Sequence, residues 1–404
     1  MSDDRYFKNP FPNYKPEIAA EFIDFETKEL KPEVRSSIRN STLKLIQYLE
    51  RKLEEEIDWK DTSVYTGTSG YTLLYLHLAE CFNDERYLQK AYSLAEKSLK
   101  CLKGRRISFL CGDSGPLALG AVIYEKLGLS ADVQFCVSNL VKLKNEVLEL
   151  GSSLPDELLY GRVGYLYALL FVKQKVTSEL IDTDLIRSVL LVILESGKYL
   201  SKRKKVTVPL SYEWHDKNYF GAAHGVSGIL TLLLQVHERL TTSEVNDLIR
   251  PTVDRLATYI FPSGNLPSSE GSTSDKLVHW CHGAPGAIFL FSYAYKVFKD
   301  PKYLNYAKGC ADVIWLRGLL KKGYGLCHGT AGNGSALLFF YQVTGDIKYL
   351  YMASQFARWC QDYGKHNCRT PDRPLSMFEG LAGTIYFLTD MEKPMRAKFP
   401  AFIL

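Results

Sequence analysis

The segment GLCHGTAG at residues 325–332, followed by the apolar run ALLFFY at residues 336–341, contains the pattern that decides the fold. Its core is Gly-x-x-Gly followed by a largely apolar segment, and this pattern occurs seven times in the chain. The seven copies start at Gly67, Gly112, Gly161, Gly225, Gly283, Gly329 and Gly380. The intervals of 45, 49, 64, 58, 46 and 51 residues indicate one structural repeat with loop insertions of different lengths.

A second pattern lies at a fixed distance from the first. Asp84, Asp300 and Asp346 each follow the first glycine of their repeat by 17 residues and open the string Asp-x-x-Tyr-Leu-x-x-Ala-x-x-x-Ala. The spacings place the Tyr, Leu and Ala residues on one helical face, and Asp is a preferred N-cap. Ser178 and Thr242 occupy the equivalent position in two further repeats, where we also expect N-caps.

Each repeat is therefore predicted to be a helical hairpin with an apolar inner helix and a more amphipathic outer helix. An inner helix that is apolar on most faces has to be buried on most sides, and seven such helices bury one another if they form a closed ring. An open solenoid is the alternative, but it needs polar terminal caps, and residues 378–389 are as apolar as the middle repeats. We expect a single all-α domain over residues 1–404, with an N-terminal extension of about 35 residues.

Composition and charge exclude several classes of protein. The chain has 46% hydrophobic residues and a net charge of only +5 over 404 residues, with the basic residues scattered. The one dense basic run, residues 202–205, is interpreted as a solvated loop. Nothing in this pattern indicates a nucleic-acid-binding protein.

The sequence also favours a cytoplasmic protein, with peripheral membrane association left open. No apolar stretch approaches the ~20 residues of a spanning helix. The N-terminus lacks the pattern of a signal peptide, and Ser2 in place of Gly excludes N-myristoylation. Nine widely spaced cysteines without a secretion signal are typical of the reducing cytosol, where a distinctive cysteine more often binds metal or catalyses.

The residues just before the first glycines indicate where the chemistry lies. If every inner helix starts at the same motif, these residues line one mouth of the ring. They are Thr66, Cys111, Tyr160, His224, His282, His328 and Glu379. Three consecutive repeats thus contribute histidine, and two of them carry the tripeptide Cys-His-Gly, at Cys281 and Cys327.

Two cysteines and a histidine from neighbouring helix starts form a Cys₂His set. Zinc binds thiolate and imidazole, and catalytic zinc commonly keeps its fourth position open. The spacing leaves open whether His282 or His328 is the third ligand, and a closed site that uses both is a structural alternative. Buried thiols beside helix-capping imidazoles, without a metal, are the less specific interpretation.

These motifs resemble those of the LanC superfamily, which comprises bacterial lanthionine cyclases and eukaryotic LanC-like proteins. The resemblance rests on AAHG at residues 222–225, HWCHG at 279–283 and GLCHG at 325–329, and extends over nearly the whole chain. It implies a double α/α toroid of seven inner and seven outer helices, with one zinc ion held by Cys281, Cys327 and His328. It further implies that His224 is the general acid/base; His282, at the position of a cyclase tyrosine, is a second candidate.

In the LanC-like relatives, glutathione is bound beside the zinc, and the resemblance assigns this role to Lys322 and to the segment Arg369, Thr370, Pro371 and Asp372. The charges suit this ligand, because Lys and Arg pair with carboxylates and Asp372 suits the ammonium group of the tripeptide.

The sequence thus predicts a zinc-dependent enzyme with glutathione as co-substrate. The zinc activates the glutathione thiol, which adds to dehydroalanine or dehydrobutyrine residues in proteins or to a small electrophile, as in a glutathione S-transferase reaction. The alternative is a glutathione-responsive adaptor without turnover, whose protein partners bind the segment NPFP at residues 9–12 or the outer helices.

Overall fold

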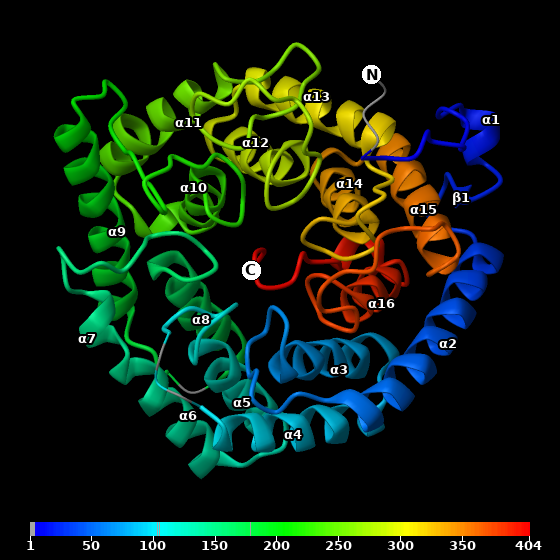
Figure 1. Ribbon diagram of the computed structural model, residues 1–404, viewed down its shortest axis with the longest axis horizontal. Coiled ribbons are helices and arrows are strands. Elements are labelled where there is room, and N and C mark those ends of the chain that lie inside the picture. Colours follow the sequence, from blue (N-terminus) through cyan, green and yellow to red (C-terminus); the bar gives the residue numbers. More distant parts are fainter. Residues whose placement is uncertain (1–4, 103, 105, 178) are drawn as a thin grey trace.

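The computed structural model describes residues 5–102, 104, 106–177 and 179–404 and is a ring of two concentric helical layers (Figure 1). The described residues form seven inner helices, and each starts at or just after the first glycine of a repeat. They are α3 (Thr68–Phe82), α5 (Ser114–Lys126), α8 (Arg162–Lys175), α10 (Val226–Gln235), α12 (Ala284–Phe298), α14 (Thr330–Thr344) and α16 (Leu381–Asp390).

The outer layer alternates with the inner one along the chain. Its helices are α4 (Glu85–Lys100), α6 (Ser130–Lys142), α9 (Thr183–Lys204), the π-helical turn η2 (Glu244–Ile249) continued by α11 (Arg250–Ala257), α13 (Pro301–Arg317), α15 (Ile347–Gln361) and α2 (Pro32–Glu56). Six of these outer segments follow their inner helix in the chain. The seventh, α2, comes from the N-terminal part of the chain and covers α16.

Short elements connect these layers. They are α1 (Pro16–Ala19), β1 (Ile23–Asp24), β2 (Glu29–Leu30), α7 (Lys144–Val147), η1 (His237–Arg239) and η3 (Pro394–Arg396). β1 and β2 pair antiparallel with Ile23 opposite Leu30. The segment before α1 lies along the outer layer, where the Asn9 side chain donates to the Trp315 carbonyl (2.8 Å) and Tyr351 donates to the Pro12 carbonyl (2.8 Å).

The ring is closed, as the apolar last repeat predicted. Helix α16 packs against α3 of the first repeat and against α2, and the Phe378 amide donates to the Tyr65 carbonyl across the junction (3.1 Å). The open solenoid is therefore wrong, and the toroid of seven inner and seven outer helices is confirmed.

Side-chain caps start most of the outer helices, whereas α2 and α6 have none, and two caps differ from expectation. Asp84, Asp300 and Asp346 each accept a hydrogen bond from the backbone amide two residues on. Ser178 lies outside the described residues, and its outer helix, α9, starts after a cap by Asp182. The expectation for Thr242 is wrong by one residue.

The adjacent Thr241 caps that helix. Its Oγ1 accepts from the Glu244 amide (3.1 Å), and the Glu244 carboxylate accepts from the Thr241 amide (2.8 Å). This reciprocal pair is a capping box, which satisfies two backbone donors at once and explains why the cap lies one position earlier.

Most inner helices are capped by backbone instead. The loop before the helix folds back so that a backbone carbonyl accepts a hydrogen bond from the helix start, as where the Thr68 amide donates to the Asp61 carbonyl (2.9 Å). At α12 the side-chain Oδ1 of Asn265 accepts from the Ala284 amide (2.7 Å). A Cβ atom on Gly67 would lie 2.2 Å from that carbonyl oxygen, and one on Gly70 would lie 2.6 Å from the Val64 oxygen. The Gly-x-x-Gly motif is therefore required by close backbone approach.

The basic run 202–205 is not a solvated loop. Its first three residues form the last turn of α9, and Lys205 ends the helix in a left-handed conformation (φ 52°). Positive charge is favourable there because it complements the helix dipole.

The C-terminal tail fills the centre of the ring (Figure 1). Phe399 stacks on Trp280 with ring centroids 5.0 Å apart, and Phe402 packs edge-on against the same ring. Gln235 holds the chain end, because its Nε2 donates to the Phe402 carbonyl and its Oε1 accepts from the Leu404 amide, both at 2.9 Å. Among the described residues, no helix is long and apolar enough to cross a membrane.

Candidate functional site

A ladder of backbone hydrogen bonds positions the two cysteines at the mouth. It joins the residues two places before the first glycine in consecutive repeats. The Cys281 amide donates to the Cys327 carbonyl (3.2 Å), and the Cys327 amide donates to the Phe378 carbonyl (2.8 Å). The ladder continues through Phe378 and Tyr65 to Leu110, so the ring closure itself fixes the spacing of Cys281 and Cys327.

Other backbone segments approach this ladder so closely that two positions beside it require glycine. A Cβ atom on Gly221 would lie 1.8 Å from the Cys281 carbonyl oxygen. Gly283 has φ +119°, a conformation that other residues rarely adopt. The backbone on both sides of Cys281 and His282 is therefore tightly constrained.

Three side chains at the mouth could hold a metal ion. The ligand atoms of Cys281, Cys327 and His328 all lie within 4.8 Å of one another, and both cysteines are buried. Among the described residues this is the only such group of His, Cys and acidic side chains. His282 is not part of it, so the geometry favours His328 over His282 as the third ligand.

The three residues fit zinc. Thiolate and imidazole are zinc ligands at about 2.0–2.3 Å, which places tetrahedral ligand atoms about 3.3–3.8 Å apart. Burial raises the pKa of the Cys327 thiol, to which the neighbouring Cys281 also contributes. The buried Cys327 thiol therefore resists ionisation without a cation, and a metal ion would remove that penalty.

His224 is held by a buried carboxylate. Its Nδ1 lies 2.9 Å from Glu157 Oε2, and the Glu157 side chain is 2% exposed. Glu157 also accepts the backbone amides of Leu159 (2.8 Å) and Tyr160 (2.6 Å). Because a carboxylate only accepts hydrogen bonds, Nδ1 carries the proton and Nε2 is left for the cavity.

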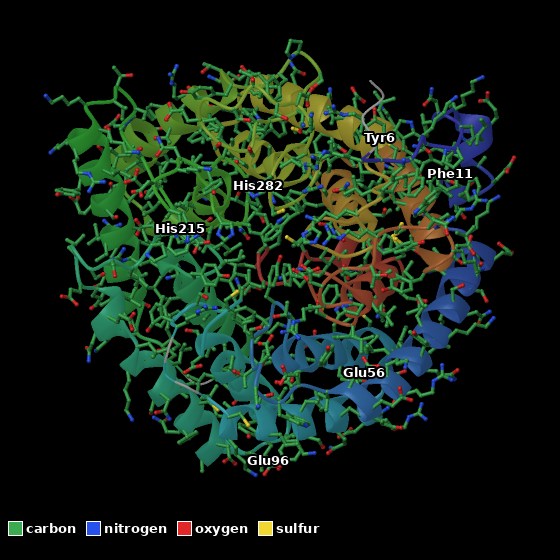
Figure 2. The ribbon with its side chains drawn as sticks, viewed as in Figure 1. Tyr6, Phe11, Glu56, Glu96, His215 and His282 are labelled. Atoms are coloured by element: carbon green, nitrogen blue, oxygen red, sulfur yellow. The ribbon has the colours of Figure 1, made fainter. Side chains whose placement is uncertain are left out.

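His282 lies on the inner side of the ring beside α12, whereas Glu56 and Glu96 lie on the outer layer (Figure 2). Its ring centroid is 6.5 Å from that of His224 and 5.6 Å from that of Tyr219. Burial, reinforced by the other histidines and Lys322, lowers the pKa of His282 to about 4. Its Nδ1 is buried without a hydrogen-bond partner among the described residues.

The predicted glutathione-binding residues lie on two adjoining loops. The Arg369 amide donates to the Lys321 carbonyl (2.8 Å), which brings the segment 369–372 beside Lys322. Lys322 is exposed and near enough to His279 to lower its pKa, after burial, to about 3. Arg369 forms an exposed ion pair with Asp372 (3.3 Å).

Thr370 is exposed and Pro371 is half-buried in the same loop. Among the residues that the structure describes, the Thr370 side chain has no hydrogen-bond partner in the protein.

Sequence reasoning missed three residues of the mouth. Glu157 gave no signal, because an acidic residue three places before Tyr160 is indistinguishable from a surface charge. Tyr65 lies two residues before its first glycine, as Cys281 and Cys327 do, and burial, with a further contribution from Cys327, raises its pKa. His279, at 5% exposure, stands 6.0 Å from the His328 ring; it was quoted only as part of a motif.

Two cavities open at the mouth, and Arg106 and Tyr160 line both. One, of about 570 Å³, contains Tyr65, Glu379 and Asp372. The other, of about 620 Å³, contains His224.

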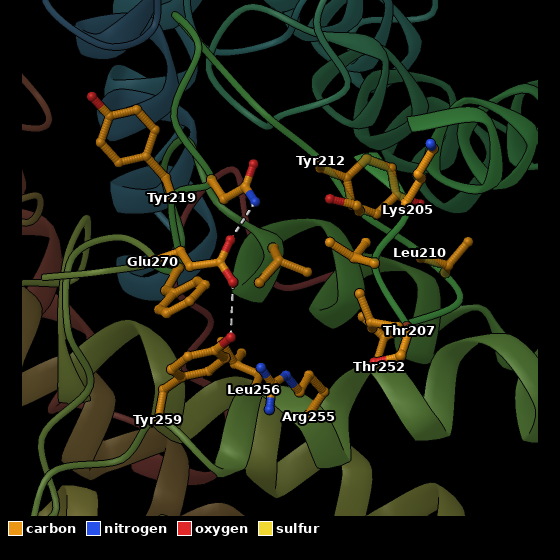
Figure 3. A pocket seen from close by; sticks show the side chains of 16 residues that line it. Lys205, Thr207, Leu210, Tyr212, Tyr219, Thr252, Arg255, Leu256, Tyr259 and Glu270 are labelled. Carbon is orange, nitrogen blue, oxygen red and sulfur yellow. Dashed lines mark hydrogen bonds between the residues drawn. The ribbon is translucent and has the colours of Figure 1, made fainter. Parts of the chain in front are cut away.

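A third cavity, of about 280 Å³, lies behind Tyr219, whose ring points away from it (Figure 3). There Glu270 accepts from Tyr259 (2.9 Å) and Asn218 (2.6 Å). None of the predicted site residues lines this cavity.

Comparisons with known proteins agree with this architecture. Residues 58–404 match the family described as lanthionine synthetase C-like protein. The chain is 46% identical over 404 residues, 100% of both chains, to a zebrafish (Danio rerio) protein named glutathione S-transferase LANCL1. The structure of the present chain is similar to that of nisin cyclase, with a TM-score of 0.64 and 18% sequence identity, over 88% of this chain and 94% of nisin cyclase.

Proposed function

Because the chain belongs to the lanthionine synthetase C-like family, we propose that it is a zinc-dependent enzyme that adds the thiol of glutathione to electrophiles. The electrophiles are dehydroalanine or dehydrobutyrine residues in proteins, or small electrophiles. The name of the zebrafish relative supports glutathione as co-substrate. The observation that carries the proposal is the metal-ligating group Cys281, Cys327 and His328 at the same mouth as the paired His224 and Glu157.

One zinc ion per chain is held by Cys281, Cys327 and His328. Bound there, zinc supplies a positive charge that favours the thiolate form of glutathione at neutral pH. The backbone ladder contributes rigidity, because it fixes both cysteines to the ring rather than to a mobile loop.

His224 provides the proton that completes the addition. The glutathione sulfur forms a bond to the β-carbon of the electrophile, the carbon–carbon π bond breaks, and its electron pair moves toward the α-carbon and carbonyl. His224 Nε2 accepts the proton that the thiol loses and then donates it to the α-carbon, so that the imidazole returns to its starting state. Glu157 stabilises the proton on Nδ1 and the orientation of the ring.

His282 is the second candidate donor. Its Nδ1 is buried without a hydrogen-bond partner among the described residues, whereas Glu157 orients the His224 ring, which favours His224 for this role.

Lys322 and Arg369 bind the carboxylates of glutathione, with Asp372 facing its ammonium group and Thr370 and Pro371 shaping the loop. In the structure Arg369 and Asp372 pair with each other at high exposure. Such an exposed pair is worth ~1 kcal/mol or less, so a ligand with both charges can replace it readily.

The Glu157–His224 pair favours an enzyme over an adaptor. A pocket that only binds glutathione has no need of an imidazole held in one orientation by a buried carboxylate, whereas proton transfer does. The same proposal places the protein in the cytoplasm, where glutathione is abundant.

Mass spectrometry of a dehydroalanine peptide incubated with the zinc-loaded protein and glutathione tests the proposal. We expect a glutathione adduct to form faster than in the absence of protein. If the rate were unchanged while calorimetry still showed glutathione binding, the protein would be a glutathione-responsive adaptor and not an enzyme.

A further inference from the structure

The cavity on the His224 side of the mouth has features that the reaction described above does not use. We propose that this cavity, the aromatic chamber, is the electrophile site, and that Tyr160 and Trp214 select planar, conjugated acceptor groups. The aromatic chamber is the space of about 620 Å³ lined by Tyr160, Trp214, His215, His224, Arg106, Glu146 and residues 152–155. The inference rests on the proposed function, because it names the second substrate of the same site.

Three ring planes in the chamber are nearly parallel. Tyr160 and Trp214 have centroids 5.7 Å apart at 29°, Tyr160 and His224 5.8 Å apart at 15°, and Trp214 and His224 6.3 Å apart at 16°. Parallel aromatic faces favour a flat π system, which gains more from offset stacking than a saturated group does. A planar acceptor bound here lies beside the His224 imidazole.

The segment that carries Trp214 is a strained hairpin. Trp214 and Lys217 exchange backbone hydrogen bonds (3.0 and 3.1 Å) around a two-residue turn. Both turn residues, His215 (φ 48°) and Asp216 (φ 57°), are left-handed although neither is glycine. Such conformations persist where the surroundings enforce them, and they are concentrated at functional sites.

Ion pairs anchor this hairpin to α9. Arg203 pairs with Glu213 (2.7 Å), and Lys204 pairs with the same carboxylate. The basic run at the end of α9 thus fixes the residue next to Trp214, so that the indole stays in place before any substrate arrives.

A buried arginine stabilises the wall of the chamber that Glu146 and residues 152–155 form. Arg162, 2% exposed, donates to the Val147, Leu154 and Glu149 carbonyls at 2.8–2.9 Å. It also pairs with Asp156 (2.9 Å). These four hydrogen bonds and a fifth to Ser152 Oγ (3.0 Å) use all five N–H donors of the guanidinium, so they fix the segment 147–156 that includes this wall of the chamber.

The chamber suits an α,β-unsaturated carbonyl in particular. Such a group is flat and conjugated, and its carbonyl oxygen gains negative charge as the thiolate adds to the β-carbon. Arg106, with its guanidinium carbon 4.8 Å from the Tyr160 ring centroid, provides positive charge at the chamber edge. A dehydroalanine residue in a peptide and a free α,β-unsaturated amide both present this group.

Ligand-observed NMR without glutathione tests the chamber by binding alone. The probes are N-acetyl-dehydroalanine methylamide, its saturated alanine counterpart, and a peptide containing dehydroalanine. We expect the unsaturated probes to bind more tightly than the saturated one, and Trp214→Ala to weaken them about tenfold. Trp59→Ala is the matched control, since Trp59 is also half-buried but packs under Lys97 and does not line the chamber.

Equal binding of saturated and unsaturated probes, or no effect of both Trp214→Ala and Tyr160→Leu, overturns the inference. The peptide and the free amide distinguish a protein substrate from a small one by which binds more tightly. In kinetics, Trp214→Ala should raise the KM of the electrophile about tenfold and leave the KM of glutathione unchanged. If Trp214-dependent binding occurs without any thioether product, the proposed function fails and the electrophile site stands.

Discussion

The two ends of the ring contain similar side chains in opposite circumstances. At the mouth, His224 borders an open cavity, and His282 Nδ1 is buried without a partner among the described residues. At the other end, where the inner helices terminate, His77 Nε2 lies 3.0 Å from the buried Asp390 carboxylate, and its ring stacks on Tyr386 at 3.8 Å. The C-terminal tail closes that end and leaves a cavity of about 170 Å³.

The electrostatic surroundings differ accordingly. At the mouth, burial and like charges lower the pKa of His282 to about 4. At the far end, burial disfavours the charge of His77, but Asp390 outweighs it and raises the pKa to about 10. A histidine is thus chemically available at one end and fixed in an ion pair at the other, so we expect substitutions at the mouth to change chemistry and those at the far end to change stability.

The largest effect is expected at the metal ligands. Cys281→Ala or Cys327→Ala removes one of three ligands, so zinc content should fall from about one ion per chain to a small fraction of that, with loss of turnover. Elemental analysis measures the zinc. Cys136→Ala, a buried cysteine on α6, is the control and should retain full zinc. Full zinc in both ligand variants would contradict the assignment.

The next effect is expected at the proton donor. His224→Ala should lower kcat by about 10²–10⁴-fold, the usual range for a positioned acid or base, with little change in glutathione affinity. Glu157→Gln keeps the ring but weakens its orientation, and should cost about 10–100-fold. Steady-state kinetics with a dehydroalanine peptide checks both. Normal turnover by His224→Ala would transfer the role to His282.

A smaller effect is expected at the carboxylate-binding residues. Lys322→Ala and Arg369→Ala remove contacts to groups whose charge does not change during the reaction. They should therefore raise the glutathione KM by about 10–150-fold, the range for one charge-assisted hydrogen bond, and leave kcat nearly unchanged. A fall in kcat with constant KM would show that these residues act in the chemical step instead.

The smallest effect on chemistry is expected at the far end. The raised pKa of His77 means that its ion pair stabilises the fold fully below the unfolded pKa of about 6.5 and that this stability is lost as pH rises toward 10. The stability difference between wild type and His77→Gln should therefore shrink from pH 6.5 to 10, as chemical denaturation at each pH would measure. Zinc content and the KM of glutathione should not change in His77→Gln. A changed KM would show that the two ends of the ring are coupled.

Sequence patterns predicted much of the mouth because its residues recur at fixed repeat positions. Cys281, Cys327, His282 and His328 all stand one or two residues before the first glycine of a repeat, so one periodicity brought them to the mouth, and the family resemblance assigned His328 as the third ligand. Glu157 could not be found in this way. It precedes Tyr160 in a loop outside the repeated position, and only the fold brings it to His224.

The closure of the ring was predicted from the apolar last repeat, but the segments that close it were not. The seventh outer helix, α2, comes from before the first repeat, and no local signal indicates that it pairs with α16. The central tail was equally hidden, because Phe399 and Phe402 resemble any apolar chain end until the space enclosed by seven helices requires filling.

The configuration of the product tests the central claim most directly, namely that a fixed acid at the mouth completes thiol addition. The protein adds glutathione to a dehydroalanine peptide, and chromatography separates the two epimers at the new α-carbon. Because His224 is held in one orientation by Glu157, we expect a single epimer from the wild type and a mixture from His224→Ala. Equal amounts of both epimers from the wild-type protein would contradict the account.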